Sequence, residues 1–237
     1  MLSRTLNFAT FDQFLRADVE QERSWIAQRR SGLAFLCVAV IVLGGGSYGA
    51  VMGCWSAPLQ ALYVAIKLPL LILLTTLGNA FLNGMLAPLL GLNLSLRQSL
   101  MLVLMSFALA SAILGALTPV ALFVVWNTPP LRPGTWLSSP EYGALQLTHV
   151  SFIALAGIIG NVRLLPLLRQ FAASASVAYK VLFAWLAGNL FLGSQLAWVM
   201  RPFIWDPAHK AVFVGSEYFH GSFYETLFEA LRRMIMN

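Results

Sequence analysis

Lys67 is the residue of this sequence that most clearly needs a chemical explanation. It lies about ten residues into the stretch 57–82, which is apolar and carries no other charge. The chain contains no Asp or Glu between Arg23 and Pro140, so no acidic side chain near it in the sequence can neutralise this lysine. A lone cation inside a membrane span costs on the order of 2.5–3.5 kcal/mol on insertion scales, and such residues often mark functional sites.

The ammonium group of Lys67 could bind an anion or the phosphate of a lipid headgroup. Helical spacing places Gln60 and Tyr63 on the same face as Lys67, so the three residues predict a short polar stripe that starts at one membrane interface. Anion binding would require a water-filled or headgroup-filled cavity beside the amine. The structural alternatives are that the lysine stem extends to the headgroups, or that its amine meets a backbone carbonyl, an amide or water.

Side chains that could catalyse a reaction or hold a metal are sparse. The apolar stretches contain no acid, which excludes a mechanism with paired carboxylates inside the membrane. The histidines, His149, His209 and His220, lack the spacing of metal ligands. The C-terminal tail adds Asp206 and Glu217 to two of these histidines, so a surface site there is an alternative, although ordinary loop composition explains the same residues. We therefore expect no enzymatic activity, no metal site and no cofactor.

The composition is that of a polytopic membrane protein. Of the 237 residues 59% are hydrophobic and 10% are charged, whereas soluble domains carry about 25% charged residues. The net charge is +6, but the basic residues are scattered, which favours a role in membrane topology over a nucleic-acid surface. Cys37 and Cys54 have no His or acid near them in the sequence, so neither a metal site nor a disulfide is supported.

Five apolar stretches, each near the roughly 20 residues that a helix needs to cross a bilayer, predict an all-α bundle of five transmembrane helices. They cover residues 33–53, 57–82, 99–126, 142–162 and 177–200. The fourth is the weakest, because it contains His149 and Asn161 and ends at Arg163. Between the second and third, residues 83–98 predict an interfacial turn or a shallow re-entrant piece. The proline-rich connection 127–141 predicts an ordered or extended loop.

The segments on either side of the five-span domain, which we place at residues 32–200, are amphipathic. Residues 1–31 contain four acids and no apolar core, which predicts a cytoplasmic amphipathic helix in place of a signal peptide. This helix could lie on the membrane surface or dock a partner. The tail, residues 201–237, is rich in aromatic residues typical of the membrane interface. Its last part, 222–236, predicts an amphipathic interfacial helix.

Glycines in the first apolar stretch predict close helix packing. Gly45, Gly49 and Gly53 are four residues apart and leave a flat groove on one helix face. This groove indicates packing within one subunit, with self-association as the alternative. Gly188 and Gly193 provide small residues in the fifth stretch, which makes that stretch the expected partner of the first.

The distribution of Lys and Arg predicts the orientation. With the N-terminus in the cytoplasm, nine of these residues fall on the cytoplasmic side and five on the other, while Lys67 lies within a span. The pair Arg29 and Arg30, next to the first stretch, favours this orientation under the positive-inside rule. The tail carries four of the five charges on the opposite side, so it would change sides if the fourth stretch did not cross.

Several short runs resemble a family of uncharacterised bacterial polytopic inner-membrane proteins that are loosely grouped with the Yip1-like five-span proteins. These runs are residues 48–53, 60–63, 67–71, 193–198, 201–203 and 221–225. The resemblance covers roughly residues 30–230. It implies a five-span bundle in the inner membrane with a cytoplasmic N-terminus, and no established activity. Lys67 and Arg201 fall in the resembling runs, which adds Arg201 to the candidate residues for binding an anion or a headgroup.

Two functional hypotheses follow. The first is a non-enzymatic scaffold or adaptor subunit of a larger membrane complex, which packs through its glycine-rich first stretch and docks partners by its terminal helices. The second is a channel, permease or lipid-handling protein built around a cavity at Lys67. The expected partners are membrane lipids and either other membrane subunits or further copies of the chain, and neither hypothesis involves nucleic acid. An enzyme that uses the tail histidines and acids is a third alternative.

Overall fold

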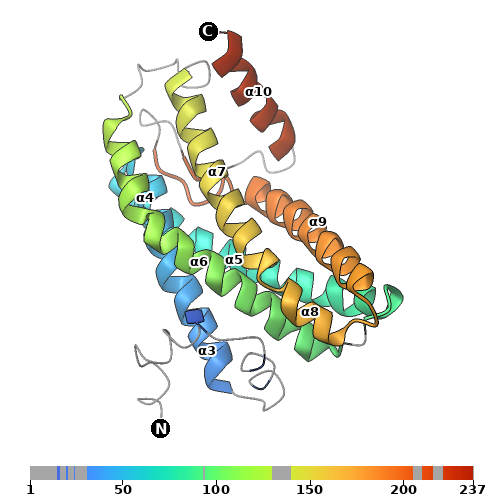
Figure 1. The fold of residues 1–237 in the computed structure, drawn as a ribbon. Coiled ribbons are helices and arrows are strands. Elements are labelled where there is room, and N and C mark those ends of the chain that lie inside the picture. Colours follow the sequence, from blue (N-terminus) through green and yellow to red (C-terminus); the bar gives the residue numbers. More distant parts are fainter. Residues whose placement is uncertain are drawn as a thin grey trace.

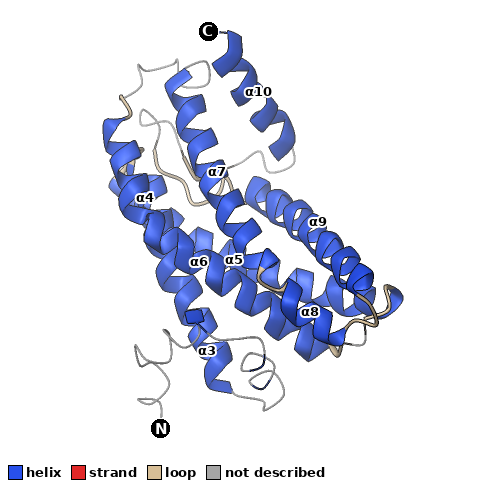
Figure 2. Ribbon diagram, in the orientation of Figure 1, coloured by secondary structure: helices blue, strands red, loops and turns tan. Residues whose placement is uncertain are grey.

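The computed structural model describes residues 15, 16, 20, 24, 31–92, 94–129, 140–204, 210–215 and 221–236. Helices make up most of this part of the chain, which contains no strand beyond one isolated bridge between Leu92 and Ala172 (Figures 1 and 2). The predicted all-α fold is therefore confirmed. Most of the predicted N-terminal helix and most of the proline-rich loop lie outside the described residues.

Five helical segments are long and apolar enough to cross a membrane, as predicted, and the chain is a multi-pass integral membrane protein. The first span, Gly32–Cys54, consists of α3 (Ser31–Val40), a π-helical turn η2 (Ile41–Gly45) and α4 (Gly46–Cys54). The second and third spans are α5 (Pro58–Leu89) and α6 (Leu96–Asn127). The fourth contains α7 (Pro140–Val162) and α8 (Leu165–Phe171), and the fifth is α9 (Ala175–Val199). An amphipathic helix, α10 (Phe223–Met236), ends the described chain.

The second helix extends seven residues beyond its predicted end at position 82. α5 continues through Asn83 and Gly84 to Leu89, and the turn that follows is short. The third helix then begins with a capping box, in which Ser95 Oγ accepts a hydrogen bond from the Gln98 amide while Gln98 Oε1 accepts one from the Ser95 amide. With 32 residues each, α5 and α6 are about 48 Å long. They exceed the roughly 30 Å hydrocarbon core, so they tilt or extend into the headgroups.

Contacts between the connections show that the spans alternate in direction. The bridge between Leu92 and Ala172 joins the α5–α6 turn to the α8–α9 turn at one end of the bundle. At the other end, the ring of Trp55 lies 6.1 Å from that of Tyr142, and Tyr142 Oη donates to Ile204 O over 3.5 Å. The fourth segment therefore runs the full length of the bundle. The tail and α10 lie at the end opposite to the start of the first span (Figure 1).

The helix α6 forms the centre of the bundle. It packs against α3, η2, α4, α5 and α7, while α5 packs against η2, α4, α6 and α9. α10 lies against α7 and α9 (Figure 1). Large apolar side chains such as Leu43, Phe123 and Phe183 are exposed on the outside of the bundle, as expected of helices that face lipid instead of water.

The glycines of the first span bring α4 close to α5. A Cβ atom added at Gly49 would lie 2.5 Å from the carbonyl oxygen of Val64, and one added at Gly53 would lie 2.6 Å from that of Gln60. Gly45 also faces α5, where an added Cβ would lie 3.3 Å from Ile72 Cδ1. All three glycines therefore contribute to packing within one chain.

The predicted pairing of the fifth span with the first is wrong. Both spans pack against α5. A Cβ added at Gly188 would lie 3.2 Å from Asn79 Oδ1, and one added at Gly193 would lie 3.9 Å from Thr75 Oγ1. Small residues permit a close approach of backbones but do not specify the partner, and α5 provides a partner on each of two faces.

Candidate functional site

The side chain of Lys67 is fully buried and its amine is hydrogen-bonded to the backbone that follows α9. Nζ donates to Met200 O over 3.2 Å and also to Pro202 O. Because α9 ends at Val199, carbonyl groups at this point have no partner inside the helix. A cation is favoured there by the negative end of the helix dipole. Lys67 thus caps the C-terminus of α9 from a neighbouring helix.

Gln60 contributes to the same contact. Its Nε2 donates to Pro202 O over 2.8 Å, and its side chain is fully buried two helical turns before Lys67. A carbonyl oxygen has two lone pairs, so Pro202 O can accept from both side chains. Two residues of α5 therefore hold the segment that leaves α9.

Two phenylalanine rings flank the amine. Lys67 Nζ lies 5.0 Å from the ring centroid of Phe203 and 5.6 Å from that of Phe213, within the range of cation–π attraction. Tyr63 meets the second ring edge to face, with centroids 5.5 Å apart and planes at 89°. Tyr63 therefore contacts the surroundings of the lysine through Phe213. We call Gln60, Tyr63, Lys67, Met200, Pro202, Phe203 and Phe213 the Lys67 clamp.

Arg201 lies beside the clamp but engages other groups. Its guanidinium carbon lies 3.8 Å from the ring centroid of Trp198, and Nη1 donates to Trp198 O over 3.2 Å. Its carbonyl accepts from the Gly215 amide over 3.0 Å, which joins the described tail segments 201–204 and 210–215. Of the four candidate binding residues, Gln60, Tyr63 and Lys67 are thus brought together, while Arg201 stacks on Trp198.

The chemistry of the Lys67 clamp suits a cation. Its groups around the amine are carbonyl oxygens and the negative faces of aromatic rings, all of which attract positive charge. The cation that fills this position is the chain's own lysine. An anion would need hydrogen-bond donors directed towards it, and here the donors of Lys67 and Gln60 are directed at Met200 O and Pro202 O.

Other polar residues inside the spans form hydrogen bonds between helices. Tyr48 Oη and His149 Nδ1 lie 2.8 Å apart and link the first span to the fourth. Asn189 Nδ2 donates to Asn161 Oδ1 over 2.7 Å and links the fifth span to the fourth. His149 and Asn161, which made the fourth stretch the weakest prediction of a span, therefore both link helices within the bundle.

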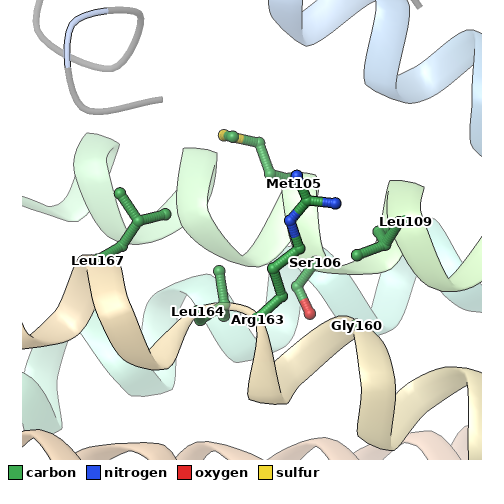
Figure 3. Close-up of a pocket in the computed structure, with 7 residues that line it drawn as sticks. All are labelled: Met105, Ser106, Leu109, Gly160, Arg163, Leu164 and Leu167. Atoms are coloured by element: carbon green, nitrogen blue, oxygen red, sulfur yellow. The ribbon is translucent and has the colours of Figure 1, made fainter. Parts of the chain in front are cut away.

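A small pocket lies between α6 and the fourth span (Figure 3). Its lining comes from α6 and from the break between α7 and α8, and consists of Met105, Ser106, Leu109, Gly160, Arg163, Leu164 and Leu167. The free space in it, about 10 Å³, is room for one water molecule. This pocket is not predictable from the sequence, in which Arg163 only marks the end of the fourth apolar stretch.

The tail site of histidines and acids lies outside the described residues, since positions 205–209 and 216–220 are not among them. Within the described part of the chain no three His, Cys, Asp or Glu side chains gather as metal ligands, and Cys37 and Cys54 are free thiols. No protein-family model, no curated protein and no solved structure matches the chain. The resemblance to the five-span family therefore stays a prediction.

Proposed function

We propose that this integral membrane protein is a non-enzymatic scaffold or adaptor subunit of a larger complex in the bacterial inner membrane, with its N-terminus in the cytoplasm. The observation that carries the proposal is the use of Lys67. Lys67, the first candidate for binding a ligand, has its amine hydrogen-bonded to Met200 O and Pro202 O of its own chain. A lysine bonded in this way stabilises the bundle and does not bind a ligand. The outer surface of the bundle then remains to bind other subunits.

The helix best suited to bind a partner is α10, because one side of it packs on α7 and α9 while other apolar side chains are exposed. Its inner side packs on α7, where a Cβ added at Gly143 would lie 3.5 Å from Ala230 O. Tyr224, Phe228 and Leu231 follow one another at helical spacing and are exposed, Phe228 to 69%. Aromatic residues of this kind are enriched at protein interfaces. The sequence predicts docking by the terminal helices, of which α10 is the one that the structure describes as a helix, while the glycines of the first span pack against α5 within the chain.

Co-purification from native membranes tests the scaffold proposal. We expect the chain, extracted with its lipids into polymer nanodiscs, to co-purify with other subunits or further copies of itself, so that the protein mass in each disc exceeds the 26.0 kDa of one chain. Phe228→Ala should weaken that complex, while Phe183→Ala, which removes an equally exposed ring on α9, should leave it intact. A monodisperse monomer in both the parent and the variant samples would contradict the proposal.

The channel, permease or lipid-handling alternative is favoured by a different observation. The buried face of α5 carries polar residues from Gln60 to Asn83, a distance of about 34 Å. Leu68, Pro69 and Ile72 interrupt this line with buried apolar side chains. Flux through proteoliposomes distinguishes the two functions, since the alternative requires an activity that Lys67→Met abolishes, whereas a scaffold gives no flux with either protein.

A further inference from the structure

The interface between α5 and α9 contains buried polar atoms that have no hydrogen-bond partner. On α5 they belong to three residues spaced four apart, and on α9 to two residues spaced four apart. The atoms are Thr75 Oγ1, both Asn79 Nδ2 and Oδ1, Asn83 Nδ2, Trp185 Nε1 and Asn189 Oδ1. Asn79 and Trp185 are fully buried, and Thr75 and Asn83 are exposed by no more than 2%.

These atoms lie along one seam. The backbones approach where Gly193 meets Thr75 and where Gly188 meets Asn79, so the two helices run antiparallel. One further turn along α9 brings Trp185 to the level of Asn83, since residues three or four apart on a helix are neighbours on its surface. Asn189 is next to Gly188 and is held by its bond to Asn161. We call these five polar side chains, Thr75, Asn79, Asn83, Trp185 and Asn189, the α5–α9 seam.

Unpaired polar atoms in such a place need a partner. The hydrocarbon around the bundle cannot supply hydrogen bonds, so polar groups at membrane depth are normally satisfied inside the protein. Within the described chain, Asn79 has no partner for either of its polar atoms, and Trp185 has none for its only donor. These side chains therefore have hydrogen-bonding groups that the described part of the chain leaves unused.

The mixture of donors and acceptors identifies the occupant. Asn79 offers both kinds of group, Trp185 only donates, and the free atom of Asn189 only accepts. A bound cation would satisfy the oxygens alone and a bound anion the N–H groups alone, whereas water both donates and accepts. We propose that the α5–α9 seam binds a cluster of buried water molecules, each bridging two or more of these side chains. This inference does not depend on the proposed function.

Radiolytic footprinting of the full-length protein in nanodiscs tests the proposal. X-ray pulses convert bound water into hydroxyl radicals, which oxidise the side chains that touch it even when these are buried. We expect Trp185 to be oxidised several-fold faster than Met52, which is buried in the first span away from the seam, after each rate is normalised to that residue in the unfolded chain. Asn79→Leu, which removes both polar atoms at the centre of the seam, should slow the oxidation of Trp185.

The possible results separate the proposal from its alternatives. Oxidation of Trp185 as slow as that of Met52 in the parent protein would overturn it, and this comparison needs no variant. Oxidation of both at similar high rates would indicate opening of the whole bundle and would also overturn it. If Asn79→Leu folds and Trp185 is still oxidised at the parent rate, the radicals come from elsewhere and the seam is dry.

Discussion

Lys67 illustrates how a single charge can be accommodated in an apolar span without a carboxylate. Carbonyl groups beyond the end of α9 lack helical partners, and the amine lacks an anion. Each group satisfies the other, and the two rings of Phe203 and Phe213 add favourable electrostatic contacts. The cost of burying the lysine is thereby offset in the native fold only, so the contact favours that fold over arrangements in which the tail is displaced.

Replacement of Lys67 by Met tests this role. The substitution keeps most of the length of the side chain but removes both bonds to Met200 O and Pro202 O, and a buried acceptor left unpaired costs about 1–3 kcal/mol. We expect the tail to detach locally, so that the Gly215 amide, which is bonded to Arg201 O, exchanges its hydrogen faster. Hydrogen–deuterium exchange with mass spectrometry measures this directly. Global stability is a poorer readout, because the substitution also removes the desolvation cost of the amine.

Leu71→Met is the matched control. Leu71 lies one turn after Lys67 on α5. Its replacement by Met introduces the same side chain without removing a polar contact, so hydrogen exchange at the Gly215 amide should stay at the parent rate. Unchanged exchange at Gly215 in Lys67→Met would contradict the capping role and would reopen the interpretation of Lys67 as a ligand-binding residue.

The sequence predicted the polar stripe of α5 but not its partner. Helical spacing was enough to group Gln60, Tyr63 and Lys67, and the lack of acids left carbonyls, amides or water as partners within the spans. Which carbonyl is used could not be predicted, because every residue carries the same group and its position depends on how the tail folds back. For the same reason Phe213 could not be connected to Lys67 from a distance of 146 positions.

At the level of elements, hydropathy located all five spans, because a bilayer imposes length and apolarity on any helix that crosses it. The end of α5 was missed, since Asn83, Gly84 and Pro88 resemble a turn in the sequence. Asn83 is instead buried against other helices, and such contacts override local propensity. The pairing of spans was missed too, because small residues on α4 and α9 do not show that both face α5.

Glycine packing on α5 is testable with one added methyl group. Gly49→Ala would place Cβ 2.5 Å from Val64 O, so α4 and α5 must separate, and we expect a loss of about 1–3 kcal/mol in the free energy of unfolding. Gly157 on α7 has nothing within 4 Å of an added Cβ. Gly157→Ala should therefore be neutral or slightly stabilising, because Ala favours a helix over Gly by about 1 kcal/mol.

Thermal unfolding of the purified protein in detergent compares the two variants. Equal melting temperatures for Gly49→Ala and the parent would show that α4 and α5 can move apart without cost. In that case the groove of the first span would again be a candidate surface for self-association.

At the level of the whole molecule, five alternating spans place the start of the first span and α10 on opposite sides of the membrane. The end at which the first span starts carries Arg97, Arg163, Arg169 and Lys180 among the described residues. Over the whole sequence, nine Lys and Arg residues fall on the side at which the first span starts and five on the other. This excess favours placing the start of the first span in the cytoplasm under the positive-inside rule.

The two native cysteines test that orientation without any added label site. Cys54 is exposed at the end of α4, opposite to the start of the first span, while Cys37 is buried within α3. With a cytoplasmic N-terminus, a membrane-impermeant maleimide should label right-side-out vesicles at Cys54, and Cys54→Ser should abolish the labelling while Cys37→Ser should not. Because the spans alternate, the side found for Cys54 also fixes the side of α10 and of any partner that docks there. Labelling of Cys54 only in inside-out vesicles would reverse the orientation and would require the basic end of the bundle to face outwards, against the rule that predicts it.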